Sequence, residues 1–329
     1  MSEHRYARAL LLLCGLCVAL ALSYLFTALP GSLAPDVQSQ IIWQLRLPQV
    51  LTAILVGAGL TTSAATLQII LANPLADPGI IGINSGASFV AAICLLGLGS
   101  VGLTLPVYWL PLACFIGALF STLVIFLLAR RIGDLSPAAV ILAGIAVSTL
   151  LSAAIAWLFW VADAQSLRNL TFWLMGSLDQ ADLPLTLAAA GVMLPVLGYV
   201  MWRRAAFNLL YLGPLQARIH GINLPRFEKI MLLCSALLVG IAVSLAGSVA
   251  FIGLLVPHGL RQLVGHDHRY LLPFCALSGA ALMLFVLWCS RLNQGMPLPV
   301  SLITASLGAP WFIWVLYRNR GSQALVARG

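Results

Sequence analysis

The residues best suited to chemistry in this sequence are the two histidines of His266-Asp267-His268. Two imidazoles beside a carboxylate are donor groups that a zinc ion takes in proteins. The three residues lie in a short turn between apolar stretches, a position that is also typical of a structural contact or of a contact with a partner subunit. We favour the structural or partner role and keep the metal role as the alternative. His258 follows Pro257 at an expected helix break, so we expect a hydrogen-bonding core residue there in place of a haem ligand.

The seven cysteines do not suggest a second site, because each lies in an apolar stretch where a thiol acts as a small hydrophobe. Cys14 and Cys17 form a C-x-x-C pair, but the pair lies inside an apolar run of helix length with no nearby histidine. We therefore predict no resident metal and no cofactor.

The segment Asn73–Ser88 is dense in turn-forming residues and leads directly into an apolar run. Its prolines and glycines specify a fixed backbone path, and it lacks the Gly-Lys-Ser/Thr ending of a nucleotide-binding loop. We expect a cytoplasmic connection here, in a chain that does not itself bind ATP through such a loop. The gate or path candidates are the residues at the end of this segment and two near the expected outer mouth: Asn84, Ser85, Gly86, Met175 and Gly176.

Asp163, Asp179 and Asp182 gather in the stretch 162–183, and no pair of carboxylates falls inside an expected span. An ion-coupled carrier usually has ionisable residues within its spans. Paired His and Asp residues or a Ser/Lys dyad at span depth, which an intramembrane enzyme would need, are not found either. We predict a transport protein that is not an enzyme, and an ion-coupled secondary transporter stays an alternative.

The elements that must position these residues are membrane spans. Of the 329 residues, 61% are hydrophobic and 8% are charged, too few polar side chains to cover a water-soluble globule of this size. Because a span needs about 20 apolar residues, the chain supplies roughly ten spans and leaves no room for a soluble domain. We predict an all-α, polytopic membrane protein that forms one integral membrane domain over residues 1–329. Its spans are expected near 8–29, 47–71, 82–99, 106–129, 137–161, 184–202, 228–248, 253–264, 271–290 and 300–317.

The run near 253–264 is too short to cross a membrane fully. Gly247, Gly253 and Pro257 indicate a broken or re-entrant helix, which is allowed where protein or a water-filled cavity covers it. The first run, Leu10–Leu29, is long for the apolar part of a signal peptide, so we expect a retained first span.

The basic residues predict the orientation. With the N-terminus in the cytoplasm, 14 of the 17 Lys and Arg residues fall inside, and only Arg46, Arg168 and Arg291 fall outside. The positive-inside rule therefore supports ten spans in the bacterial inner membrane with both termini cytoplasmic. The net charge of +8 is explained by orientation, and we expect no nucleic-acid partner.

The longest polar connection on the cytoplasmic side runs from Arg203 to Lys229. Within it, Leu209–Ile222 is predicted to form one or two short helices, one of them opened by Gly213-Pro214 and ended by Gly221. A short, semi-apolar helix exposed to the cytoplasm favours a protein partner. An amphipathic segment lying on the membrane surface is the alternative.

Several motifs, in the same order along the chain, resemble the permeases of type II ATP-binding-cassette (ABC) importers for iron chelates, haem and cobalamin. The most specific are Arg46-Leu47-Pro48, Asn73-Pro74-Leu75-Ala76-Asp77-Pro78-Gly79, Phe172–Leu178, Ala250–His258, Asp267-His268-Arg269 and Leu307-Gly308-Ala309-Pro310. The resemblance covers nearly the whole chain. It implies a membrane-spanning subunit that carries haem or a siderophore across the inner membrane using ATP hydrolysed by a partner; a cobalamin importer of the same family is the alternative.

The resemblance also implies partners: a second permease in a homodimer or a paired heterodimer, two cytoplasmic ATPase subunits and a periplasmic substrate-binding protein. The binding protein would meet Arg46 and Arg291 with acidic residues, unless these arginines simply reach the lipid headgroups. Gln49 stands where relatives often carry a further arginine, so we expect fewer charge pairs. The ATPase would dock on the residues that match the family's short coupling helices: Leu209, Leu212, Gly213, Gln216, Ala217, Arg218 and Gly221.

Overall fold

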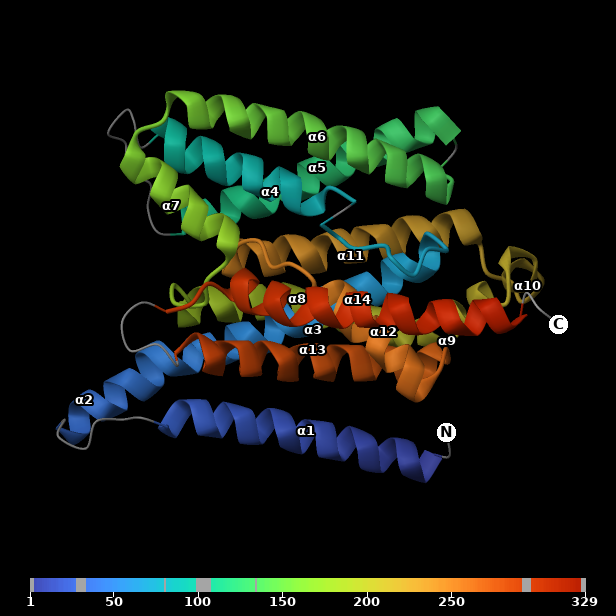
Figure 1. Ribbon diagram of the computed structural model, residues 1–329, viewed down its shortest axis with the longest axis horizontal. Coiled ribbons are helices and arrows are strands. Elements are labelled where there is room, and N and C mark those ends of the chain that lie inside the picture. Colours follow the sequence, from blue (N-terminus) through green and yellow to red (C-terminus); the bar gives the residue numbers. More distant parts are fainter. Residues whose placement is uncertain are drawn as a thin grey trace.

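The computed structural model describes residues 3–27, 34–79, 81–98, 108–133, 135–291 and 297–326, and over these residues the regular structure is entirely helical (Figure 1). Side chains are described up to residue 314. The helices are α1 (Glu3–Phe26), α2 (Pro35–Gln40), η1 (Ile41–Arg46), α3 (Leu47–Ile70), α4 (Ile83–Ala92), η2 (Ile93–Leu98), α5 (Trp109–Gly133), α6 (Pro137–Val161), α7 (Ala164–Met175), α8 (Leu183–Trp202), α9 (Arg204–Tyr211), α10 (Pro214–Ile219), α11 (Leu224–Ala246), α12 (Ile252–Val264), α13 (His268–Ser290) and α14 (Val300–Val326).

Each of the ten segments predicted to be a span contains a helix in the structure. In the part of the chain that the structure describes, seven helical stretches are long and apolar enough to cross a membrane, and Ile83–Gly97 and Val300–Trp314 are shorter apolar helices. The remaining predicted span, near 253–264, corresponds to α12. This helix has 13 residues and is about 20 Å long, which is less than the ~30 Å thickness of the hydrocarbon core. The prediction of an all-α polytopic fold with one short helix is therefore confirmed.

Local sequence signals begin several of these helices. Pro137 and Pro184 occupy the first turn of α6 and α8, where a missing N–H costs no hydrogen bond. The Ser136 hydroxyl accepts a hydrogen bond from the backbone N–H of Ala139, and the Asp182 carboxylate accepts one from that of Leu185. Because proline and cap residues act within one turn, these starting points could be predicted from sequence.

The centre of the bundle is formed by α3, which lies between α11 and α13 (Figure 1). An added Cβ on Gly57 would lie 2.1 Å from the carbonyl oxygen of Gly279, so these two glycines allow α3 and α13 to approach backbone to backbone. The Thr61 hydroxyl donates to the carbonyl oxygens of Gly57 (2.8 Å) and Cys275 (2.7 Å). Peripheral helices keep exposed apolar side chains, such as Leu12 on α1 and Trp160 on α6, as expected for surfaces that face lipid or a second subunit.

The chain between α3 and α4 does not stay outside the bundle, although the sequence led us to expect a cytoplasmic connection there. It follows the end of α3 and turns back between the helices (Figure 1). As a result, Asp77 lines the same cavity as Ser248, which follows the C-terminal end of α11. The non-helical residues 247–251 then lead into α12, whose first turn lies against this returning loop.

Candidate functional site

The short helices α9 and α10 project at one end of the bundle, at which α1 also begins and α14 ends; we call it the α10 end (Figure 1). Gly213 separates the two helices with φ of +118°, and an added Cβ there meets no atom within 4 Å. Pro214 then occupies the first turn of α10. The exposed apolar side chains of this surface are Tyr211 (52% exposed), Leu212 (68%), Leu215 (69%) and Ile219 (67%).

The predicted coupling residues are not equivalent in the structure. Four of them, Leu212, Gln216, Arg218 and Gly221, are exposed. Ala217 instead lies on the inner face of α10 and is fully buried. Leu209 and Gly213 are partly buried. Ala217 therefore holds α10 against the bundle and cannot itself contact a docked protein. Leu215 and Ile219 are not among the predicted coupling residues, although their spacing of four residues places both on one helix face.

Arg46 and Arg291 lie together at the opposite end of the bundle, which we call the α2 end. Arg46 Nη1 donates hydrogen bonds to the carbonyl oxygens of Tyr24 (2.9 Å), Leu25 (3.0 Å) and Thr27 (2.7 Å). These oxygens belong to the C-terminal turn of α1 and the residue after it, where the helix dipole favours a cation.

Arg291 is paired within the chain. Its Nη2 lies 3.1 Å from Asp179 Oδ1 and 3.3 Å from Gln49 Oε1, while the arginine side chain stays 48% exposed. Gln49 is 2% exposed, donates to Asp179 Oδ1 and accepts from the Tyr24 hydroxyl. The position at which relatives often carry arginine is thus an uncharged residue inside this network. Asp179 lowers the net positive charge that the α2 end offers to an acidic partner.

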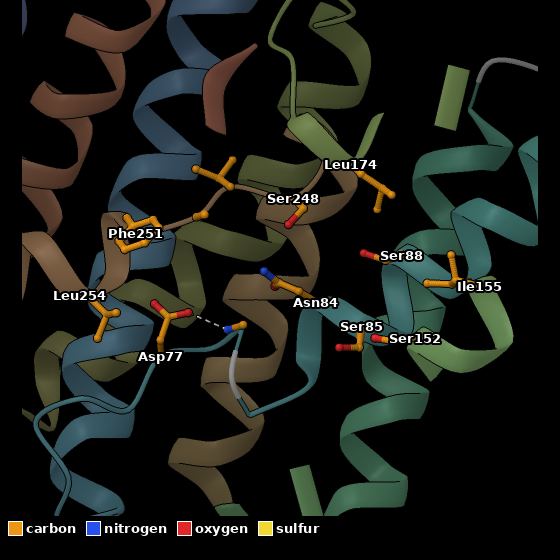
Figure 2. A pocket seen from close by; sticks show the side chains of 13 residues that line it. Asp77, Asn84, Ser85, Ser88, Ser152, Ile155, Leu174, Ser248, Phe251 and Leu254 are labelled. Carbon is orange, nitrogen blue, oxygen red and sulfur yellow. Dashed lines mark hydrogen bonds between the residues drawn. The ribbon is translucent and has the colours of Figure 1, made fainter. Parts of the chain in front are cut away.

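A cavity of about 530 Å³ lies inside the bundle between α4, α6, α7 and α12 (Figure 2). Its polar lining comes from Asp77, Asn84, Ser85, Ser88, Ser152 and Ser248. Phe251, Leu254, Ile155 and Leu174 supply apolar groups. Two of the five gate or path candidates, Asn84 and Ser85, therefore line this cavity. A third, Gly86, contacts α5, because an added Cβ would lie 2.3 Å from the carbonyl oxygen of Gly117.

Asp77 is the single ionisable side chain among the residues that line this cavity. Its Oδ1 accepts a hydrogen bond of 2.8 Å from the backbone N–H of Gly79, drawn as a dashed line in Figure 2. An added Cβ on Gly253 would lie 2.6 Å from Asp77 Oδ2, so the first turn of α12 leaves room for the carboxylate. Among the described residues, the buried Oδ1 atom of Asn84 has no hydrogen-bond partner. This arrangement places the carboxylate of Asp77 inside the helix bundle. Its position could not be predicted, because Asp77 belongs to no apolar run.

A second cavity of about 550 Å³ is lined by residues near the start of α5, the C-terminal part of α7, the end of α11 with Gly247, and the non-helical stretch 297–299. Tyr108, Phe172 and Trp173 supply aromatic side chains, and Gly176 also lines it. Met175, the remaining path candidate, is 42% exposed and is absent from the lining of both cavities.

The histidines make separate contacts. The ring of His258 lies edge-on to those of Trp311 (centroids 5.8 Å apart) and Phe312 (6.4 Å) on α14. The ring of His266 stacks on Tyr211 at 5.2 Å, whereas Nδ1 of His268 is hydrogen-bonded to Asn208. Within the described residues, His266 and His268 thus serve contacts with α9.

Comparison with known proteins identifies the family. The model of the FecCD transport family matches residues 8–318. The vitamin B12 import system permease of Vibrio cholerae is 38% identical over 98% of this chain and 97% of its own length, and the hemin transport system permease of Yersinia pestis is 39% identical over 92% and 91%. A solved metal-chelate-type ABC transporter in an inward-facing conformation superposes with a TM-score of 0.85 at 32% identity, over 95% of this chain and 99% of that one. This chain therefore belongs to the FecCD transport family.

Proposed function

We propose that this permease carries an iron chelate, haem or a siderophore complex, across the inner membrane. The chain is the membrane-spanning subunit of an ABC importer and a multi-pass inner-membrane protein, and ATP is hydrolysed by a partner subunit. A hemin permease is among the similar proteins, and the observation that carries the choice of haem is the lining of the second cavity. Its aromatic residues Tyr108, Phe172 and Trp173 offer flat faces to a planar macrocycle.

Two ATPase subunits dock at the α10 end in this proposal. The apolar side chains of α9 and α10 are largely exposed in the single chain, and a permanent subunit interface would bury them. The predicted set Leu209, Leu212, Gly213, Gln216, Ala217, Arg218 and Gly221 marks the same surface, with Ala217 acting from beneath it. Both termini then lie in the cytoplasm with α9 and α10.

The binding protein docks at the α2 end through Arg46 and Arg291. Both side chains are partly exposed there, and Asp179 leaves the guanidinium of Arg291 accessible.

A second permease, identical or paired, covers the exposed faces of α6 and α14, on which Trp157 is 74% and Ile313 65% exposed. The chelate then passes between the two permeases, along Asn84, Ser85 and Gly176. Residues 1–329 form one membrane domain in this arrangement.

The second candidate substrate is cobalamin, because B12 permeases match this chain as well as the hemin permease does. The test is reconstitution of the permease with its ATPase and binding protein in proteoliposomes, followed by accumulation of haem, a ferric siderophore and cobalamin. We expect ATP-dependent uptake of haem or the siderophore. Uptake of cobalamin alone would select the second candidate. Uptake that an uncoupler abolishes, and that continues without the ATPase, would show an ion-coupled carrier.

A further inference from the structure

The side chain of Asn208 on α9 is bonded to the turn between α12 and α13. Its Nδ2 donates to Asp267 Oδ1 at 2.6 Å, and its Oδ1 accepts from the backbone N–H of His268 at 2.7 Å and faces His268 Nδ1 at 3.0 Å. Because this amide oxygen accepts, Nδ1 of His268 carries the proton. One side chain of α9 thus makes three hydrogen bonds to residues about 60 positions away in the sequence.

Ring contacts surround these hydrogen bonds. Phe207 and His268 are both 0% exposed, and their ring centroids are 6.1 Å apart. Tyr211 stacks on His266 with an interplanar angle of 18°. The buried rings exclude water from the Asn208 bonds on one side, so a group lost from the network is not readily replaced by solvent. The exposed ring of Tyr211 places the same turn beside the apolar surface of the α10 end.

The turn continues into the helix that borders the cavity. From Gly265 the chain leads back along α12 to Ile252 and Gly253, where Asp77 lies against the first turn. Phe251 and Leu254, at this end of α12, line the cavity of about 530 Å³. Since α12 has only 13 residues, a shift of the turn at its C-terminal end is carried to the cavity wall within one short helix.

We propose that Asn208 is the positioning residue that transmits movement of α9 to α12, and so links the ATPase docking surface to the cavity. The proposal rests on the proposed function of α9 and α10. When a docked ATPase moves these helices, the hydrogen bonds of Asn208 carry the turn at Asp267 and His268 with them. Asn208 needs no contact with the ATPase or with the transported chelate in this role.

The test exchanges the donor and the acceptor of the Asn208–Asp267 bond in the complete transporter. Asn208→Asp places two carboxylates at hydrogen-bond distance, and we expect transport per ATP hydrolysed to fall roughly fivefold to thirtyfold. Asp267→Asn keeps an amide oxygen for Asn208 and for the N–H of Arg269 and loses the exposed ion pair with the Arg269 side chain, so its effect is expected to be small. In the double variant, Asn208→Asp with Asp267→Asn, the new amide N–H at position 267 donates to the carboxylate at position 208, and the amide oxygen stays with the Arg269 side chain. Only the cap on the N–H of Arg269 is lost, so the ratio should return most of the way to the wild-type value.

The matched control is Asn223→Asp, the same chemical change at the exposed N-cap of α11, where aspartate accepts from the N–H of Arg226 equally well. The ATPase should co-purify in equal amounts with every variant. A wild-type ratio in Asn208→Asp, or a double variant as poor as the single one, would overturn the proposal. If Asn208→Asp does not accumulate, recovery of accumulation in the double variant decides in the same way. A wild-type chain that binds no ATPase would instead overturn the proposed function.

Discussion

At the α10 end the exposed side chains are mainly apolar, whereas at the α2 end the polar groups are already bonded within the chain. Leu215 and Ile219 point away from the bundle with more than half of their surface exposed. Arg46 and Arg291 instead have carbonyl or carboxylate partners. A protein that stays bound gains most from burying apolar surface, and a protein that comes and goes is guided by charge. The contrast fits a permanent ATPase at one end and a transient binding protein at the other.

The largest effect is expected from Leu215→Glu combined with Ile219→Glu. Each buried aliphatic side chain contributes about 1.5–3 kcal/mol, so losing both should release the ATPase from the purified complex. Co-purification from mild detergent measures it, with Ser39→Glu combined with Gln40→Glu, two exposed residues of α2 at the other end, as the control. ATPase retained in full by the double variant would contradict the assignment of this surface.

A smaller effect is expected from Arg46→Glu combined with Arg291→Glu. At low ionic strength we expect binding-protein affinity to fall roughly tenfold, and the loss should shrink in high salt because screening weakens exposed charges. Surface plasmon resonance at two salt concentrations measures this, with Arg168→Glu as the control on the same predicted side. Salt should leave ATPase retention at the α10 end nearly unchanged, and an equal salt dependence at both ends would remove the contrast.

Gly213→Ala tests whether the connection between α9 and α10 must be a left-handed turn. An added Cβ has open space, but φ of +118° strains a residue with a side chain by about 1–2 kcal/mol. We expect α10 to be less well ordered and transport to decrease modestly while the ATPase remains bound. Hydrogen exchange of residues 209–222 reports the ordering, and unchanged exchange would show that the turn relaxes without cost.

The smallest effect is expected from pH. Hydrogen bonds from Arg269, and then from Asn208, hold the pKa of Asp267 well below its usual range. A carboxyl group with a lowered pKa in the folded state stabilises the fold at pH values above the pKa of unfolded aspartate, about 3.9. This stabilisation is lost as the pH falls below that value. The difference in thermal stability between the wild type and Asp267→Asn should therefore stay constant from pH 8 to about 5. It should shrink as the pH falls below about 4, and a difference that stays unchanged down to about pH 3 would show that the pKa of Asp267 is not lowered in the folded protein.

Much of the fold could be predicted because its signals are local. Each predicted apolar run contains a helix, and Gly213, Pro214 and Gly221 predicted the bounds of α10, since proline and positive φ restrict the chain within a turn. The candidate site was predicted less completely. Asn84 and Ser85 do line a cavity, but Asp77 was placed outside the bundle and Ala217 was taken for a contact residue. Whether a loop turns inward, or which face of a short helix is buried, depends on neighbours distant in the sequence.

The composition and order of the spans, the basic asymmetry and the family motifs can be read from the sequence alone, because each is a property of neighbouring residues. Helix packing is what brings Asp77 to Gly253, pairs Arg291 with Asp179, and joins Asn208 of α9 to the turn before α13. These contacts join residues far apart along the chain, and they form because helix packing brings particular side chains within hydrogen-bond distance. No periodicity or composition specifies such a pairing.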